Sequence, residues 1–155
     1  MSTKFSTGWA ELDDLIVGFR SVGLYRVFGD EEIAVDAFLA TVQLRLPDEV
    51  DVVPKIELLA AERELPLFDT EIMLKLQARQ SDRPVLFGSR GDNMDLGYAT
   101  DGDIRVTRRY MDGFFTGEVR IDVTKNSIGV EGSFEECWYP GASVLGLAGR
   151  PVAAS

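Results

Sequence analysis

The sequence predicts a single α/β domain in which helices cover a largely parallel sheet, and three features of the chain support this prediction. An apolar run over 24–28 ends at Gly29, and the sixteen residues 31–46 that follow contain neither Gly nor Pro. Two further apolar runs, over 50–53 and 84–88, have the length of buried parallel strands. Beyond residue 104 apolar and polar side chains alternate, which indicates antiparallel strands.

Two helices are predicted in the first third of the chain. Trp9, Leu12 and Leu15 recur at the spacing of one face of a short helix over 8–17, which follows two hydroxyl residues. The helix over 31–46 is apolar on most of its sides. We therefore expect it to be buried, either between the sheet and other elements or against a partner.

The strand–turn–helix unit over 24–46 is the frame in which P-loop proteins hold a nucleotide. A phosphate loop reads Gly-x-x-x-x-Gly-Lys-Ser/Thr, because backbone N–H groups surround the phosphates, the Lys meets their charge and the hydroxyl binds Mg²⁺. Here the first Gly is present, but acidic residues follow it and the second Gly, the Lys and the hydroxyl are replaced. The degenerate phosphate loop consists of Gly29, Asp30, Glu31, Glu32, Ala34, Val35 and Asp36. We expect no nucleotide or other cofactor, and no catalysis.

The middle of the chain is predicted to contain a strand over 50–54 and helices over 55–64 and 70–80. The residues between the two helices have two interpretations. They could form a short strand that ends at Asp69, although Pro66 disfavours a central strand. Alternatively, Asp69 or Thr70 caps the following helix, which is the interpretation we favour.

The C-terminal half is predicted to consist mainly of strands, near 104–109, 118–124 and 132–138. Short turns, including one over 111–117, join them, so they must be antiparallel to one another. The complete prediction is an α/β fold with a parallel sheet at its centre, antiparallel C-terminal strands and helices on both faces.

The composition limits the classes of function. At 155 residues, 45% of them hydrophobic, the chain can form one domain over 1–155, with the small apolar segment 141–155 as a loosely packed tail. No run approaches the roughly 20 apolar residues of a membrane span, and no signal peptide is visible, so we expect a cytoplasmic protein without membrane contact. Because the chain has a single cysteine, Cys137, and no histidine, we expect no metal site.

The charge is strongly acidic, with a formal net charge of −10 and only 16 Lys and Arg residues against 26 Asp and Glu residues. Such a surface repels nucleic acid unless basic residues cluster. A composition that is acidic and poor in Lys is typical of salt-accumulating archaea, and acidity that serves solubility is the alternative. The one candidate basic patch consists of Arg105, Arg108, Arg109, Arg120 and Lys125.

The order of motifs resembles the RecA superfamily, in particular proteins of the RadA and KaiC kind. Residues 6–18 read Ser-Thr-Gly-x-x-x-Leu-Asp-x-Leu-x-x-Gly, and a strand and Gly29-Asp30 follow. The C-terminal strands are similar as well, with Lys-Asn-x-x-Gly over 125–129 and Gly-x-Phe over 132–134. The middle of the chain is shorter than in such ATPase domains.

The resemblance implies roles for three positions. In the superfamily an Asp at the end of a strand handles Mg²⁺, which would be Asp69, and a polar residue ending the next strand senses the γ-phosphate, for which Ser89 is nearest in position. The basic residues of the turn at 125–129 would reach a neighbouring subunit's nucleotide. Ser127 stands where that turn has an Arg. The chain therefore resembles a superfamily member that has lost both its own phosphate loop and the arginine it would lend a neighbour.

Three hypotheses about function follow. The first is a non-catalytic, RecA-like regulator or scaffold that associates with copies of itself, as a ring or filament, or with a RecA-like ATPase. The second is an accessory paralogue of a DNA-repair recombinase, which would depend on the basic patch. The third, an enzyme with unrecognised chemistry, has no nucleophile–base pair to support it.

Aromatic residues mark a candidate interface for association. Phe114 and Phe115 fall in the predicted turn, and the pair at 138–139 looks exposed. Large apolar side chains in water usually mark an interface, and the alternative is that Phe114 and Phe115 fold back onto the sheet. The interface candidates are Phe114, Phe115, Trp138 and Tyr139.

Overall fold

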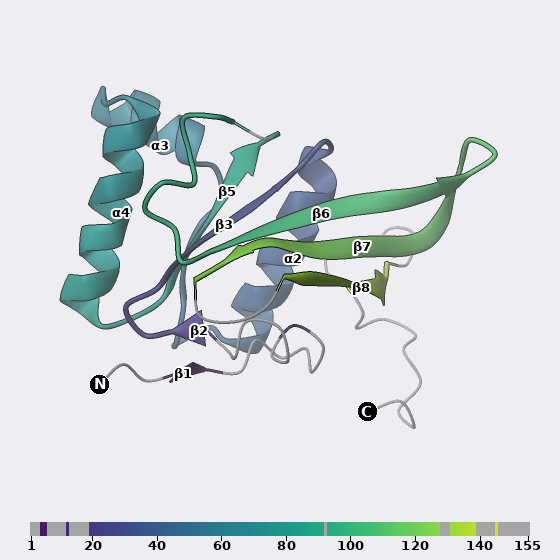
Figure 1. The fold of residues 1–155 in the computed structure, drawn as a ribbon, viewed down its shortest axis with the longest axis horizontal. Helices are drawn as coiled ribbons and strands as arrows, with labels where there is room; N and C mark the ends of the chain where they lie inside the picture. The colour runs from purple at the N-terminus through teal and green to yellow at the C-terminus, as the bar shows by residue number, and fades with distance from the viewer. Residues whose placement is uncertain are drawn as a thin grey trace.

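The structure is a computed structural model that describes residues 4–5, 12, 19–91, 93–127, 131–138 and 145. Its main sheet has six strands in the order β4-β5-β3-β6-β7-β8 (Figure 1). Their bounds are Leu24–Gly29 for β3, Asp51–Val53 for β4, Val85–Arg90 for β5, Gly102–Met111 for β6, Phe114–Asn126 for β7 and Gly132–Cys137 for β8. A separate antiparallel ladder joins β1 (Lys4–Phe5) to β2 (Phe19–Arg20). The helices are α2 (Glu32–Arg45), α3 (Ile56–Arg63) and α4 (Leu67–Ser81).

Strand β3 lies inside the sheet, with β5 on one side and β6 on the other, and it is parallel to both. All six of its residues are buried. Parallel strands that are covered on both faces read as continuous apolar runs, which is why the sequence shows no alternation here. The predicted parallel strands over 24–28, 50–53 and 84–88 are confirmed.

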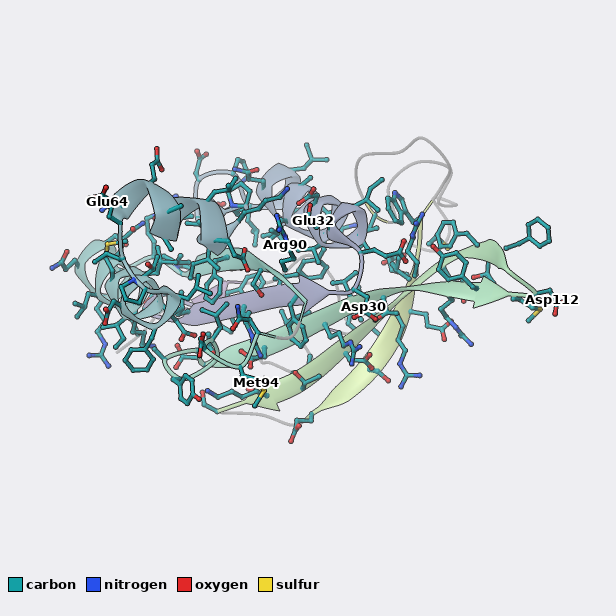
Figure 2. The ribbon with its side chains drawn as sticks, turned by 90° about the horizontal axis from the view of Figure 1, so that it is seen from above. Asp30, Glu32, Glu64, Arg90, Met94 and Asp112 are labelled. Atoms are coloured by element: carbon teal, nitrogen blue, oxygen red, sulfur yellow. The ribbon has the colours of Figure 1, made fainter. Side chains whose placement is uncertain are left out.

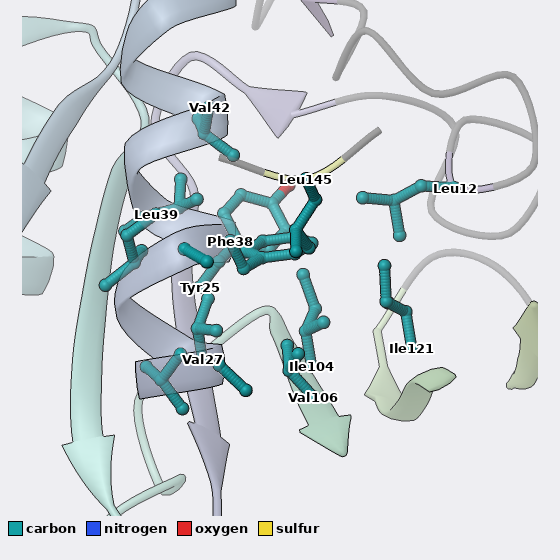
Figure 3. Close-up of a cluster of buried hydrophobic side chains, with 14 of the residues drawn as sticks. Leu12, Tyr25, Val27, Phe38, Leu39, Val42, Ile104, Val106, Ile121 and Leu145 are labelled. Atoms are coloured by element: carbon teal, nitrogen blue, oxygen red, sulfur yellow. The ribbon is translucent and has the colours of Figure 1, made fainter. Parts of the chain in front are cut away.

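Alternate residues of the central strands face two separate cores. Helix α2 packs on one face, against a cluster that includes Tyr25, Val27 and Leu86 (Figure 3). Helices α3 and α4 pack on the other face, where Leu24 and Phe87 contact Leu74, Ala78 and Ile56. The prediction of helices on both faces is therefore confirmed, and seven of the fourteen residues of α2 are buried.

The C-terminal strands form an antiparallel meander in which β6 pairs with β7 and β7 pairs with β8. The turn between β6 and β7 is only Asp112–Gly113, both with positive φ (51° and 83°), as a two-residue hairpin turn requires. The predicted turn over 111–117 was therefore too long, because β7 already begins at Phe114. The end of the β6–β7 hairpin extends well beyond the other strands (Figure 1).

Helix α4 corrects the predictions for Asp69. It begins at Leu67 with Pro66 as its N-cap residue, so neither a strand that ends at Asp69 nor a cap at Asp69 or Thr70 is present. Pro66 has φ −61° and ψ 156°, the extended backbone of an N-cap residue, so the helix starts ahead of Asp69 and Thr70. Asp69 lies in the first turn, where its charge suits the positive end of the helix.

Several predictions fall on residues outside the described part of the chain. Of the predicted helix over 8–17 the structure describes Leu12 alone, which is helical and buried. Of the tail over 141–155 it describes Leu145 alone, which is buried and donates its N–H to Thr41 Oγ1 at 2.7 Å. Tyr139 is not described.

The close approach of β6 to the end of β3 gives a testable prediction. A Cβ atom on Gly29 would lie 2.2 Å from the carbonyl oxygen of Val106. We expect Gly29→Ala to lower the free energy of unfolding by about 2–3 kcal/mol, because β6 or α2 must shift. Gly91→Ala is the control, since its Cβ would meet nothing within 4 Å and only the left-handed φ costs about 1 kcal/mol. Urea denaturation measures both, and an equal loss would contradict the close approach.

Candidate functional site

The candidate site is the turn between β3 and α2, at the edge where the parallel strands β3, β4 and β5 end. Ligands of open α/β sheets bind outside the carboxyl ends of the strands, so this is where a nucleotide would be expected. Only Asp30 and Glu31 separate β3 from α2. The N–H groups of Ala34 and Val35 both donate to the Glu31 carbonyl, at 3.2 and 3.4 Å, as part of the helix.

The turn between β3 and α2 is shorter than a phosphate loop. A phosphate loop needs four residues between its two glycines, followed by a Lys that faces the ligand. At the corresponding positions Ala34 and Val35 are already helical and are 0% and 3% exposed in the core under α2. The chain therefore differs from a P-loop in backbone course as well as in residue type. Position 29 requires a glycine because a Cβ atom there would collide with the Val106 carbonyl of β6.

The Glu31 carboxylate is held by two side chains of β6. Arg108 Nε donates to Glu31 Oε2 at 2.9 Å, Arg108 Nη2 donates to the same oxygen, and the Tyr110 hydroxyl donates at 3.0 Å. The hydrogen bonds from Arg108 hold the pKa of Glu31 below its usual value of 4.5. Glu31 is therefore ionised near neutral pH and fixed against β6.

The other two acidic residues of the turn also have cationic partners. Glu32 accepts from Lys55 Nζ at 3.1 Å and from Arg90 Nε at 2.7 Å, and both hydrogen bonds, that of Lys55 first, lower its pKa. Figure 2 shows Glu32 and Arg90 next to one another at this edge. Asp30 lies 3.5 Å from Arg105. The cations that could meet a phosphate thus already pair with carboxylates of the turn.

Arg108 also lies among three aromatic rings. Its guanidinium carbon is 5.5 Å from the Tyr110 ring centre, 5.2 Å from Phe115 and 5.5 Å from Trp138, distances typical of cation–π contacts. Trp138 is only 5% exposed, and the expectation that it faces solvent is wrong. Its ring packs edge-on against Phe115 at 5.7 Å, and Phe115 is half-buried. These two aromatics therefore pack within the subunit.

The remaining residues of the predicted basic patch also form ion pairs or hydrogen bonds within the chain. Arg109 pairs with Glu135, Arg120 Nε donates to Asp122 Oδ1 at 2.9 Å, and Lys125 Nζ donates to the Gly97 carbonyl at 2.6 Å. Every member of the predicted patch thus has a partner within the chain. Among the described residues, the patch therefore forms no open basic surface.

A small cavity lies beside the turn, between Glu32, Lys55 and Ser89. Its volume of ≈ 10 Å³ has room for about one water molecule. Ser89 Oγ is buried and has no hydrogen-bond partner among the described residues, so a water molecule there would satisfy it. Ser89, the residue nearest in position to the γ-phosphate sensor of the superfamily, thus borders a space for one water molecule.

Two further predicted residues, Asp36 and Asp69, are exposed. Neither forms an ion pair with the rest of the described chain.

A buried polar cluster on the α4 side of the sheet was not predicted from the sequence. Arg26 Nη2 lies 2.9 Å from Asp103 Oδ2, and both side chains are less than 10% exposed. Glu71 of α4 is fully buried and accepts from the N–H groups of Gly97 and Tyr98, at 2.8 and 3.3 Å. Burial raises the pKa of Glu71. Arg26, a charged residue inside the apolar run 24–28, was the one sign of this cluster in the sequence. The cluster fixes the β5–β6 loop.

The pair between Glu31 and Arg108 gives a prediction for pH dependence. We expect Glu31→Gln to lower the free energy of unfolding at pH 7 by about 1 kcal/mol, since Arg108 loses its ionic partner. Because the folded-state pKa of Glu31 is lowered, its contribution is complete above 4.5 and is lost as the pH falls below that value. The difference between wild type and variant, measured by urea denaturation, should therefore shrink in acid. Asp36→Asn is the matched control, and a difference that does not change with pH would contradict the pair.

Comparisons with known proteins bear on the fold. No protein-family model matches the chain, and no curated protein matches it. Among solved structures, a DnaB-like replicative helicase, described with its interactions with primase, matches at a TM-score of 0.66 and 10% identity, over 92% of this chain and 63% of that one. The chain therefore spans less than two thirds of that helicase.

Two further solved structures match nearly over their whole length. A KaiC-like protein from the hyperthermophilic archaeon Pyrococcus horikoshii OT3 matches at a TM-score of 0.66 and 10% identity, over 94% of this chain and 98% of that one. A third structure, described as an ATPase domain, matches at a TM-score of 0.68 and 12% identity, over 92% of this chain and 90% of that one. In the described part of the chain no helix has the length and apolar character needed to cross a membrane. The chain therefore has the RecA-like fold shared by these helicase, KaiC-like and ATPase domains.

Proposed function

We propose that the chain is a single, shortened RecA-like domain that neither binds nor hydrolyses ATP and acts as a regulator or scaffold through association with protein. The observation that carries this proposal is the two-residue turn between β3 and α2, which places Ala34 and Val35 in the core. A nucleotide would find neither a loop to surround its phosphates nor the lysine of the motif, since Val35 is at that position.

Electrostatics oppose nucleotide at the same turn. A polyphosphate would approach Asp30, Glu31 and Glu32, and each unit charge a few Å away costs about 1–4 kcal/mol at effective dielectrics between water and a protein surface. Lys55, Arg105 and Arg108 offset part of this repulsion, but each is already paired with one of these carboxylates. A phosphate would have to compete for Lys55 and the nearby arginines.

The end of the β6–β7 hairpin supports the role in association. Phe114 is 78% exposed, Met111 70% and Tyr110 50%. Met111 and Phe114 are opposite one another in the ladder at the tip, and large apolar side chains in water are typical of an interaction surface. With Phe115 and Trp138 packed inside the subunit, Phe114 and Met111 are the anchors that remain, and the partner would be a second copy or a RecA-like ATPase. The alternative of a recombinase paralogue depended on the basic patch and gains no support from its ion pairs.

The first test of this proposal is nucleotide binding. ATP with Mg²⁺ should produce no thermal shift and no release of phosphate, because the turn cannot hold the phosphates. An active RecA-like ATPase measured in parallel is the positive control. A shift that grows with ATP concentration into the micromolar range would contradict the proposal.

The second test rebuilds the motif. The triple variant Ala34→Gly, Val35→Lys and Asp36→Thr should restore neither ATP binding nor hydrolysis, since residues 34 and 35 face the core. Burying a lysine at position 35 should lower the free energy of unfolding by about 2–4 kcal/mol. Asp36→Thr alone, at an exposed position, is the control and should change stability little. ATP hydrolysis by the triple variant would show that the short turn can open into a phosphate loop.

A further inference from the structure

A segment of the β5–β6 loop, residues 93–101, covers part of the core on the α4 side of the sheet. We refer to these residues as the strap, and Figure 1 shows the loop that contains them running alongside α4. Leu96 of the strap is only 5% exposed and belongs to the apolar cluster of Leu74 and Phe87. Ala99 is partly buried against the same cluster. Movement of the strap away from α4 would therefore uncover apolar side chains.

A buried carboxyl group of α4 binds the backbone of the strap. Glu71 is fully buried, and each of its oxygens accepts one N–H group, Oε1 from Gly97 at 2.8 Å and Oε2 from Tyr98 at 3.3 Å. On the other side of the strap, Lys125 Nζ donates to the Gly97 carbonyl at 2.6 Å. The closed position of the strap thus keeps the Glu71 carboxyl group away from water.

The charged groups near Glu71 come from several elements. Asp103 of β6 faces Glu71, and the repulsion between the two carboxylates disfavours the ionised form of Glu71. The other charged groups have partners of their own: Arg26 of β3 pairs with Asp103, Lys75 of α4 with Asp101, Lys125 of β7 with the Gly97 carbonyl, and Arg63 of α3 with Met73 Sδ. Lys75 and Lys125 therefore direct their charges at acceptors other than Glu71.

The protonation of Glu71 is coupled to the position of the strap. Burial, with a smaller effect of Asp103, raises the pKa of Glu71 above its usual value of 4.5, and the N–H groups of the strap offset only part of this rise. In an open strap, water reaches the carboxyl group and its pKa returns toward 4.5. The closed strap therefore binds the proton more tightly than the open one. A protonated carboxyl group also still accepts an N–H through its carbonyl oxygen.

The direction of the pH dependence follows from this difference. Because the closed-state pKa is the higher one, the stabilisation of the closed strap is complete below pH 4.5. It is lost as the pH rises from 4.5 through the closed-state pKa. Acid therefore favours the closed strap, and a higher pH favours the open one.

We propose that the strap is a pH-sensitive switch, which Glu71 keeps closed while it is protonated and which opens more readily when Glu71 is ionised. Opening withdraws Leu96 from Leu74 and Phe87, so the switch controls how much apolar surface the α4 side exposes. This inference goes beyond the proposed function and depends neither on ATP binding nor on the hairpin.

Amide hydrogen exchange, followed by NMR from pH 4 to pH 8, tests the switch. After correction for the intrinsic pH dependence of exchange, the protection of the Gly97 and Tyr98 N–H groups should fall as the pH rises. The fall is tenfold for each pKa unit that separates the closed strap from the open one. The N–H groups of β3 are the internal reference and should stay better protected than the strap throughout, because the strap opens without unfolding the domain.

Three variants assign the pH dependence to Glu71. Glu71→Gln keeps the shape of the side chain but does not titrate, so the protection of its strap should not change with pH. Asp103→Asn removes the repelling carboxylate and should move the fall in protection to lower pH. Asp69→Asn is the matched control, because it removes an exposed carboxylate two residues before Glu71 and should leave the wild-type profile unchanged. Circular dichroism checks that each variant is folded.

Three results would overturn the proposal. Protection of the wild-type strap that stays constant or rises with pH excludes the switch. A fall with pH that persists in Glu71→Gln assigns the titration to another group. Strap N–H groups that are as well protected as those of β3 exclude a local opening. The wild-type profile alone decides the first and third points, whether or not the variants fold.

Discussion

The two-residue connection between β3 and α2 is the constraint on which the rest of the site depends. Strand β3 is buried on both faces, and Gly29 at its end lies against the Val106 carbonyl of β6. Because α2 begins so soon after it, the first turns of the helix face the sheet and bury Ala34 and Val35. The carboxylate of Glu31 then lies at the positive end of the helix, where an anionic ligand would otherwise be favoured.

The ion pairs around this turn connect elements that are distant in sequence. Glu31 links the start of α2 to Arg108 of β6. Glu32 links the same helix start to Arg90 of β5 and to Lys55, the residue before α3. Partly exposed pairs of this kind stabilise a protein by about 0–1 kcal/mol each. Their larger effect is on charge, because each carboxylate of the turn and its cationic partner neutralise one another.

Because side chains alternate along the β6–β7 hairpin, one of its two adjacent phenylalanines is packed within the subunit and the other is exposed. Phe115 points toward Trp138 and Arg108, whereas Phe114, the adjacent residue, points to solvent. Successive residues of a strand face opposite sides, and here Phe115 faces the side covered by Trp138 whereas Phe114 faces the exposed side. The base of the hairpin is therefore packed within the subunit, while Met111 and Phe114 at its tip are exposed.

Local sequence patterns predicted the α/β class, the parallel centre and the antiparallel C-terminal strands, and they showed that the Gly, Lys and hydroxyl of a phosphate loop are not at positions 34–36. These follow from local periodicity and from residue chemistry at fixed spacing, which do not depend on contacts across the fold. The sequence did not determine where α4 begins, that Trp138 is buried, or which cation pairs with which carboxylate. Arg108 and Glu31 are 77 residues apart, and only the pairing of β3 with β6 brings them together. These features depend on the tertiary structure, because strand order and register bring together side chains that no local sequence pattern relates.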